Sequence, residues 1–289
     1  MQGRIVELGA RDWHAPGSDA KWIAAVEDGK VLYFPQLAFE LSEAERALLK
    51  PELLARGVRN ISWDTHRGLK GVAGDAAVQQ AVTGIVSRFA SQATALVHGL
   101  FPAYAPHLRA APASLRPMSV SGRQQSVRAD DKRLHVDAFP SRPNYGERIL
   151  RVFSNINPHG EPRVWRVGEP FEAVARNFIR RAKPYSRWQA KVLNALHVTK
   201  SLRSEYDHLM LQIHDLMKAD DDYQRTSQQV TMNFPPGSSW VCFSDQTVHA
   251  AMSGQHMLEQ TFHLPAAKQY NPDMSPLAIL GRLAGHPVI

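Results

Sequence analysis

The sequence predicts an α+β fold: a double-stranded β-helix (jelly-roll) core, with N-terminal helices packed outside it and a helical insertion between core strands. Three observations indicate this. Short strand-like segments fill residues 103–170 and return after residue 229. The N-terminal part carries an amphipathic helical pattern, and a second helical block occupies residues 171–229. Two small sheets closed into a barrel, with a cavity at the mouth, would accommodate this order of elements.

The N-terminal part predicts one strand and two helices. Residues 31–34 form an apolar strand-like run, which a Pro-containing turn separates from a helix beginning at Ser42 and running through Leu49. Ser42 and Glu45 have the spacing of a capping box, which supports that helix start. Residues 77–100 place apolar side chains at helical spacing. We therefore expect this segment to be an amphipathic helix packed on a sheet.

The remaining strands are expected at residues 149–157, 229–234, 239–243 and 256–264, each bounded by Pro, Gly or Asn. Residues 171–179 and 188–217 read as helices with a break at Pro184, and residues 275–285 as a short terminal helix. We interpret 171–229 as an insertion within one domain that spans residues 1–289.

Composition restricts the class of protein. The formal net charge of +7 favours an anionic partner. No nucleic-acid-binding motif is recognisable, so nucleic acid is not the expected partner. No apolar run has the length of a membrane span, and residues 1–7 lack the apolar region of a secretory signal. The single cysteine, Cys242, cannot form an internal disulfide and suits a reducing compartment. We expect a cytoplasmic protein without a transmembrane segment.

One motif suggests a metal site. His135 and Asp137 are two residues apart, and His249 follows far downstream. In a strand, residues two apart point to the same side, so His135 and Asp137 could reach one ion together. Two histidines and one carboxylate can occupy one face of an octahedral Fe(II) and leave the other face open. A surface His and Asp beside a loop is the alternative for the isolated triplet, but the strand-like runs that flank both parts of the motif favour the metal site.

This arrangement resembles the Fe(II)/2-oxoglutarate-dependent dioxygenases, in which a His-x-Asp motif and a distal histidine hold the metal. A narrower resemblance links the segments 134–141 (LHVDAFPS), 150–158 (LRVFSNINP) and 162–165 (PRVW) to the Kdo hydroxylases. These enzymes hydroxylate C3 of the acidic sugar 3-deoxy-D-manno-oct-2-ulosonic acid. The resemblance implies Fe(II) held by His135, Asp137 and His249, with 2-oxoglutarate and O₂ as co-substrates. It also implies a glycolipid substrate, Kdo attached to lipid A of lipopolysaccharide.

The co-substrate arginine departs from one common pattern of the superfamily. Many members bind the distal carboxylate of 2-oxoglutarate with an Arg shortly after the distal histidine, but residues 250–264 contain no Arg or Lys. Arg151 is the preferred candidate, because it would share a strand face with further polar residues, and Arg148 is the second. Asn155 and Thr261 are expected to hydrogen-bond the co-substrate or the sugar; ordinary strand-end pairing is the alternative.

An acidic substrate would need cations at the mouth of the site. The candidates for substrate contact are Arg128, Arg133, Arg142, Asn157 and Arg163. The 171–229 block also combines basic residues with Trp188 and other apolar side chains, which is the composition of a peripheral contact with an anionic bilayer at the inner face of the bacterial inner membrane. A core-packed helix with a charged outer face would have the same composition.

Two other functions are compatible with the sequence. The same iron chemistry could act on another sugar or small molecule, because loops that set specificity cannot be read from sequence. Alternatively, a non-catalytic basic barrel could bind an anionic glycolipid. Fe(II) binding that depends on His135 and His249 distinguishes an enzyme from such a binding protein.

Overall fold

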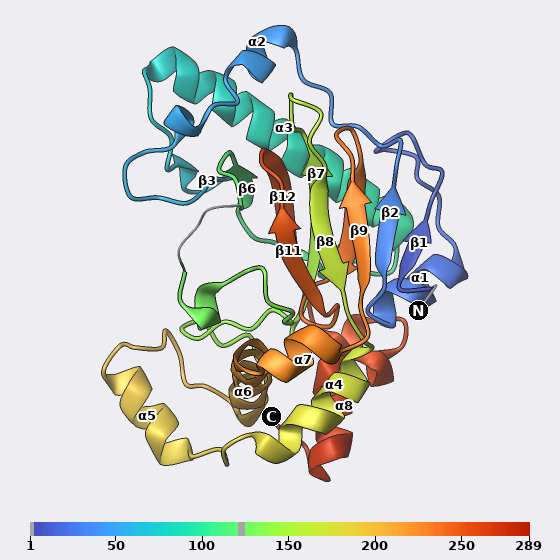
Figure 1. Ribbon diagram of the computed structural model, residues 1–289, viewed down its shortest axis with the longest axis vertical. Helices are drawn as coiled ribbons and strands as arrows, with labels where there is room; N and C mark the ends of the chain where they lie inside the picture. Colours follow the sequence, from blue (N-terminus) through green and yellow to red (C-terminus); the bar gives the residue numbers. More distant parts are fainter. Residues whose placement is uncertain (1–2, 121–124) are drawn as a thin grey trace.

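The computed structural model describes residues 3–120 and 125–289, which form two β-sheets surrounded by helices (Figure 1). The larger sheet contains β1 (Ile5–Glu7), β2 (Val31–Phe34), β3 (Ile61–Asp64), β4 (Gly68–Lys70), β5 (Arg109–Ala110), β6 (Ala113–Arg116), β7 (Arg148–Asn155), β10 (Ser239–Phe243) and β12 (Met257–Leu264). Its order is β1-β2-β10-β7-β12-β6-β3-β4, with β5 also paired to β12. The expected strands at 31–34, 149–157, 239–243 and 256–264 are therefore confirmed, as β2, β7, β10 and β12.

The smaller sheet contains β8 (Arg163–Val167), β9 (Val230–Phe234) and β11 (His249–Ser253), in the order β11-β8-β9. The two sheets share an aromatic core, in which Phe153 and Trp240 of the larger sheet pack against Trp165 and Phe234 of the smaller one. The rings of Phe234 and Trp240 stack with their centroids 4.1 Å apart. This core fixes the spacing of the sheets and so the distance between the strands that carry the polar residues described below.

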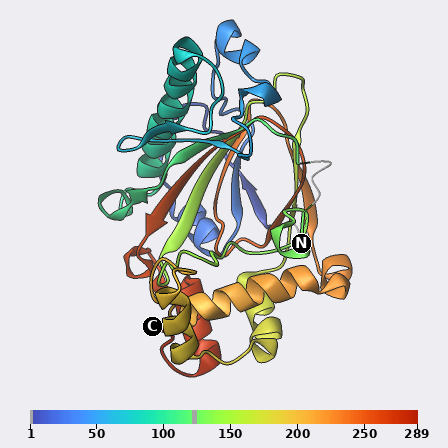
Figure 2. The same cartoon turned by 90° about the vertical axis from the view of Figure 1, so that its left-hand side faces the viewer.

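Three helices precede the central strands: α1 (Ala20–Glu27), α2 (Glu43–Ala47) and α3 (Ala76–Leu100). The capping box at Ser42 and Glu45 is present, which confirms the expected start of α2. Helix α3 covers the outer face of the larger sheet (Figures 1 and 2). Its apolar stripe, which includes Ile85 and Phe89, joins one core with Val152 and Leu258 of the sheet. The alternate residues of β7 and β12 therefore face the smaller sheet.

The helices between β8 and β9 pack together beneath the sheets (Figures 1 and 2). They are α4 (Phe171–Phe178), α5 (Arg187–Ala195), α6 (Glu205–Ala219) and α7 (Asp221–Thr226), and the terminal α8 (Pro276–Ala284) joins them. Apolar residues of α4, α6 and α8 form a second core with Leu134, Val136 and Val248. The helical block thus supports the segments that carry His135 and His249, through the residues on either side of each.

The expected continuous helix over 188–217 is wrong, because α5 ends at Ala195 and α6 begins at Glu205. His197 adopts a positive φ of 55°, which a right-handed helix does not allow. A new capping box then forms between Ser204 and Asp207 and starts α6. The apolar periodicity on both sides concealed this break in the sequence.

Short 3₁₀ helices lie at Pro51–Leu53, Ala105–His107, Val127–Ala129, Ile179–Arg181, Ala266–Lys268 and Pro272–Met274. Over the residues that the structure describes, none of the helices is both long and apolar enough to span a bilayer.

Candidate metal centre

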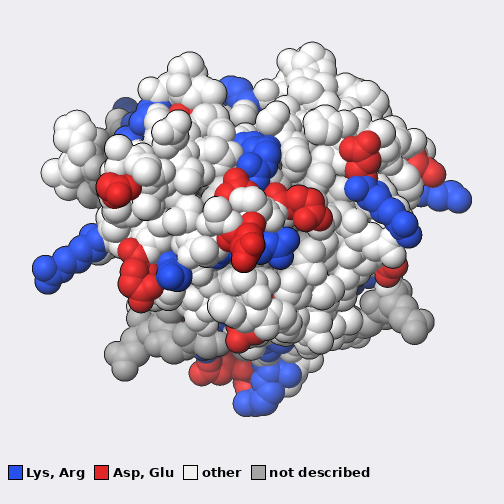
Figure 3. All heavy atoms as spheres, turned by 90° about the horizontal axis from the view of Figure 1, so that it is seen from above, with Lys and Arg blue, Asp and Glu red and all other residues white. Residues whose placement is uncertain are grey.

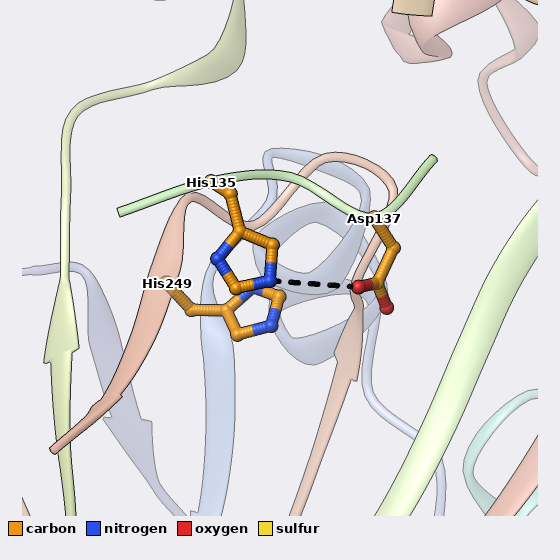
Figure 4. A group of neighbouring side chains, drawn as sticks. All are labelled: His135, Asp137 and His249. Carbon is orange, nitrogen blue, oxygen red and sulfur yellow. Dashed lines mark ion pairs between the residues drawn. The ribbon is translucent and has the colours of Figure 1, made fainter. Parts of the chain in front are cut away.

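His135, Asp137 and His249 come together between the two sheets, with one potential ligand atom of each within 4.8 Å of the others (Figure 4). His135 pairs with His249, at the start of β11, through a single β-bridge. The backbone N–H of Asp137 donates to the carbonyl of Ser244 at 2.8 Å. We expected a strand through residues 135 and 137, but the segment forms only the single bridge at His135. The two side chains nevertheless point to one place, where His135 Nε2 lies 3.8 Å from Asp137 Oδ1.

Both imidazoles are held in the tautomer that a metal requires. The Nδ1 of His135 lies 2.7 Å from the carbonyl oxygen of Arg133, and the Nδ1 of His249 lies 2.8 Å from that of Thr247. A carbonyl can only accept, so each Nδ1 carries the proton and each Nε2 keeps its lone pair. Such backbone partners commonly orient metal-binding histidines.

Burial favours neutral imidazoles at the site, and the neighbouring cations favour an ionised carboxylate. Burial lowers the pKa of His135 and of His249, and the neighbouring imidazole of His249 lowers that of His135 further. Burial opposes ionisation of Asp137, but the Arg151 guanidinium and both histidines outweigh it and lower the pKa of Asp137. Its Oδ2 is buried without a hydrogen bond, although Arg151 Nη2 lies 3.0 Å away. These donor atoms are those that a divalent transition metal binds.

A chain of ion pairs leads from Asp137 into the larger sheet. Arg151 on β7 reaches Asp137 with one nitrogen and Glu259 on β12 with the other, at 3.3 Å. Glu259 in turn pairs with Arg116 on β6 at 2.8 Å. Burial tends to raise the pKa of Glu259, but Arg116 and Arg151 lower it overall. The interior face of three adjacent strands therefore carries alternating cations and anions beside the triad.

A cavity of about 220 Å³ opens beside the triad. Besides the triad, its lining includes Arg116, Arg151 and Glu259 from the larger sheet and Arg163 and Trp165 from β8. The ring of Trp165 stacks on His249 with a centroid distance of 4.9 Å and an interplanar angle of 23°. The cavity thus has one wall on the larger sheet with Arg116 and Arg151, and another on β8 with Arg163 and the indole of Trp165, which also stacks on His249.

Arg148 points away from this cavity. It is completely buried and donates to Asp245, Gln246 and Gln269, while its guanidinium lies 3.9 Å from the centre of the Phe243 ring. Arg148 and Arg151 thus have opposite surroundings, as expected from their odd separation on one strand. The interactions of Arg148 hold the loop before His249 rather than a ligand beside the triad.

The two asparagines also lie outside the cavity lining. Asn155 donates to the carbonyls of Glu161 and Phe234, and its Oδ1 accepts from the N–H of Asn157. Asn157 accepts from the N–H groups of His159 and Glu161. Both side chains stabilise the turn between β7 and β8, so their positions do not support the expected contact with a co-substrate or sugar.

The remaining sequence candidates are distributed around the site. Arg163 lines the cavity and donates to the carbonyl of Gly254. Thr261 and Arg142 line a neighbouring cavity, which they share with Arg151. Arg128 is exposed and pairs with Asp215, and Arg133 pairs with Asp221. The structure therefore places Arg151 and Arg163 in the cavity of the triad and Thr261 and Arg142 in the neighbouring cavity, whereas the side chains of Arg128 and Arg133 are engaged with helices α6 and α7.

Sequence reasoning missed several residues of the site. Arg116 and Glu259 are ordinary strand residues in the sequence, and only the pairing of β6 with β12 brings them together. Trp165 belongs to the segment 162–165, but nothing in the sequence predicts its stacking on His249. His214 of α6 also approaches, with its ring centroid 5.5 Å from that of His135.

Comparisons with known proteins show which family this chain resembles over nearly its whole length. The sequence model of a family described as 3-deoxy-D-manno-oct-2-ulosonic acid (Kdo) hydroxylase matches residues 10–287. The chain is similar to the crystal structure of the Kdo hydroxylase KdoO, a non-haem Fe(II) α-ketoglutarate-dependent dioxygenase, in complex with cobalt(II). The two are 43% identical, with a TM-score of 0.94 over 99% of this chain and 97% of that chain. Structures of KdoO with α-ketoglutarate and Fe(III), and with succinate and Fe(III), give TM-scores of 0.93 and 0.92 at the same identity and coverage. A search of curated proteins gave no match.

Proposed function

The chain belongs to the Kdo hydroxylase family, and on that premise we propose that it hydroxylates C3 of the Kdo sugar of Kdo-lipid A. It is an Fe(II)- and 2-oxoglutarate-dependent dioxygenase that acts on Kdo. In the overall reaction, 2-oxoglutarate and O₂ become succinate and CO₂, while one oxygen atom converts a C–H bond of the sugar to C–OH. The observation that carries the proposal is the convergence of His135, Asp137 and His249 beside a cavity walled by arginines.

We further propose that the two facing sheets form a double-stranded β-helix within one domain covering residues 1–289. Their shared aromatic core supports this arrangement. Residues 171–229 would be an insertion, since β8 and β9, which flank it, are neighbours in one antiparallel sheet. Such a connection could be short without the helices, so the helical block is an addition to the core.

His135, Asp137 and His249 would hold the iron. Their free Nε2 atoms, ionised carboxylate and burial suit a divalent iron with open positions. When bound, the iron activates O₂ for oxidation of a C–H bond. The protein's part is to keep both imidazoles neutral and oriented, and to exclude bulk water through the core around Trp165 and Phe153.

Arg151 would bind 2-oxoglutarate together with Arg116 and Arg163. A planar guanidinium can grip a carboxylate through two parallel hydrogen bonds. A volume of about 220 Å³ suits a small organic acid, because pockets for drug-sized ligands are larger, ~300–1,000 Å³. Glu259 holds the Arg116 and Arg151 side chains in position. Thr261 would help to position the Glu259 carboxylate, to which its hydroxyl donates at 3.4 Å.

The substrate would meet cations around the mouth, with Arg142 and Arg163 as the nearest of the expected set and Arg128 and Arg133 farther out along the helices. The positive net charge does not form a continuous basic patch on the face seen from above (Figure 3). On the face seen from above, basic and acidic side chains alternate (Figure 3). Recognition of an acidic sugar would therefore depend on particular arginines near the site and not on a general basic surface.

Contact with the inner face of the inner membrane is part of this proposal, through α5 and the segment after it. Trp188, Leu196 and Val198 are 75%, 68% and 53% exposed. Arg187 and Lys191 flank Trp188 on the same helix. An exposed indole beside basic residues is suited to the headgroup region of an anionic bilayer. The other basic residues of the block are less available, since Arg176 and Arg181 pair with Glu172 and Asp220.

The test is anaerobic titration of the protein with Fe(II) and 2-oxoglutarate, followed by a succinate-release assay with Kdo-lipid A. We expect a visible metal-to-ligand absorption band in the wild type and none in His135→Ala. Mass analysis of the product should then place one added oxygen on the Kdo ring at C3. A band without substrate-dependent succinate release would indicate the same iron chemistry on another molecule. Absence of the band in the wild type would favour a non-catalytic glycolipid-binding protein.

A further inference from the structure

Two further cavities continue outward from the metal cavity. The first, of about 470 Å³, lies between the end of β12 and residues 139–144, which follow the His-x-Asp motif. Arg151 lines both this cavity and the metal cavity. The second is a groove of about 820 Å³ between α3, the β3–β4 hairpin and residues 109–113. It shares Arg109, Ala111, Arg142 and His263 with the first. The shared side chains place the three cavities side by side, as a path of neighbouring cavities from Arg151 to the surface of α3.

The charged residues along this path are mainly cationic. Arg67, Arg109 and Arg142 line the outer groove, and Asp64 and Glu147 are the carboxylates on the path. Arg109 is paired with Glu147, while neither Arg67 nor Arg142 forms an ion pair with any residue that the structure describes. Both of these arginines are exposed. They can therefore offer hydrogen bonds to an anionic ligand without first breaking an internal pair.

Helix α3 adds a row of hydroxyl groups. Ser87, Ser91 and Thr94 line the groove at helical spacing and so lie along one face of the helix. The hydroxyls of Ser87 and Thr94 donate to the carbonyls of Gly84 and Ala90, and their oxygens can still accept hydrogen bonds from the hydroxyl groups of a sugar. Small residues such as Ala90 lie between them and leave the floor of the groove shallow. A lipid chain would gain little from this polar floor, whereas a glycan could form hydrogen bonds along it.

The wall that carries Arg142 is held in place from outside. The carbonyls of Pro140 and Ser141 accept hydrogen bonds from the Arg203 side chain and the Lys200 N–H. Asp207 Oδ1 accepts from the N–H groups of Asn144 and Tyr145. These contacts tie both sides of Arg142 to the segment from α5 to α6. The groove is therefore formed before a ligand binds, which lowers the entropic cost of binding.

We propose that this groove binds the acidic glycan portion of the substrate that lies beyond the sugar being hydroxylated. The inference rests on the proposed function, because it takes the metal cavity as the place where the reacting sugar is oxidised. The ligand class is a sugar chain bearing carboxylate or phosphate groups. Arg67 and Arg142 bind those groups, and Ser87, Ser91 and Thr94 bind sugar hydroxyls.

The experiment compares two substrates in the succinate-release assay: Kdo-lipid A and the methyl glycoside of Kdo alone. The variants are Arg67→Glu, Arg142→Glu and Ser91→Trp, and the control is Arg225→Glu, which changes an exposed arginine on α7 outside the groove. We expect each groove variant to raise KM for the glycolipid by about tenfold, more at low salt for the charge reversals, with kcat changed by less than about twofold. The control should show neither effect. A thermal melt of each variant verifies folding.

The source of the anionic group is distinguished by repeating the assay with glycolipid from which the phosphates have been removed. If the penalty of Arg67→Glu disappears, the groove binds phosphate; if it persists, the groove binds a sugar carboxylate. Unchanged KM for the glycolipid in all three groove variants, with an active wild type, would overturn the groove assignment alone. A wild type that releases succinate with neither substrate would overturn the proposed function, and the groove assignment with it.

Discussion

The main chains of His135 and His249 exchange two hydrogen bonds, of 3.0 and 2.9 Å, so backbone pairing places the two imidazoles side by side. Their ring centroids are 4.6 Å apart. Because the pairing involves only backbone atoms, replacing either side chain should leave the bridge and the fold in place. The site is thus preformed before metal binds.

The first prediction follows because the backbone pairing does not depend on the two imidazole side chains. His135→Ala and His249→Ala should each lower Co(II) affinity by more than ~100-fold, beyond the loss typical of removing an outer partner of a ligand. The metal-free melting temperature should change little. Isothermal titration with Co(II) measures the affinity, and His98→Ala, an exposed histidine on α3, is the control. Metal affinity that survives in either variant would mean that the metal is held elsewhere.

Arg151→Lys should raise the KM for 2-oxoglutarate by at least about tenfold, since a lysine cannot form two parallel hydrogen bonds to one carboxylate. Because Arg151 also contacts Asp137, Co(II) affinity should be measured in the same variant. We expect the effect on 2-oxoglutarate to exceed the effect on the metal. The opposite order would mean that Arg151 serves chiefly to hold Asp137.

Arg148→Met should act on stability instead. Breaking a buried ion pair on one side leaves Asp245 uncompensated and typically costs about 3–5 kcal/mol. Chemical denaturation should show this loss, while the KM for 2-oxoglutarate of the folded protein stays at the wild-type value. A stable variant with a raised KM would instead assign the co-substrate to Arg148.

The contrast between these two arginines illustrates what could be predicted from the sequence. The odd separation of Arg148 and Arg151 correctly indicates opposite strand faces, and the polar pattern favoured the face of Arg151. The same pattern also favoured Asn155 and Asn157, but β7 ends at Asn155, where both side chains serve the following turn. The alternation of side chains predicts which face of the sheet a residue lies on only within the strand, and it no longer applies beyond the strand end.

Other parts of the site depend on pairings that periodicity does not encode. The Arg116–Glu259–Arg151 chain requires the register of β6, β7 and β12, with Arg116 opposite Met257 and Arg151 opposite Thr261. No local signal in the sequence specifies that register. In contrast, the helix over 77–100 and the capping box at Ser42 were predictable, because their signals lie within a few residues of each other.

Acid sensitivity provides a further prediction, at His256. Burial, together with the nearby His159, lowers the pKa of His256 to about 4. The unfolded chain, with a histidine pKa near 6.5, then binds more protons than the folded one between pH 6.5 and 4. Stability should therefore fall as pH falls through this range, by on the order of 2 kcal/mol from this residue.

The test replaces His256 with Asn, which tolerates the positive φ of 56° at this position. As pH falls from 7 towards 4.5, the unfolding free energy of wild type should fall by more than that of His256→Asn. Parallel pH profiles would show that His256 does not titrate differently in the two states.

Membrane contact through α5 provides the last prediction. Trp188 and Leu196 contribute nothing to the core, so Trp188→Ala and Leu196→Ala should leave stability unchanged. If they enter the bilayer, each loss of apolar burial of about 1.5–3 kcal/mol should weaken vesicle binding by about tenfold or more. Vesicle binding is measured by sedimentation, with vesicles of anionic phospholipid compared with zwitterionic ones. The control is Val58→Ala, which changes an exposed apolar residue elsewhere. Binding should fall with added salt because Arg187 and Lys191 act through screened charge. Equal vesicle binding by all variants would exclude α5 as the contact and leave the exposed tryptophan without a membrane role.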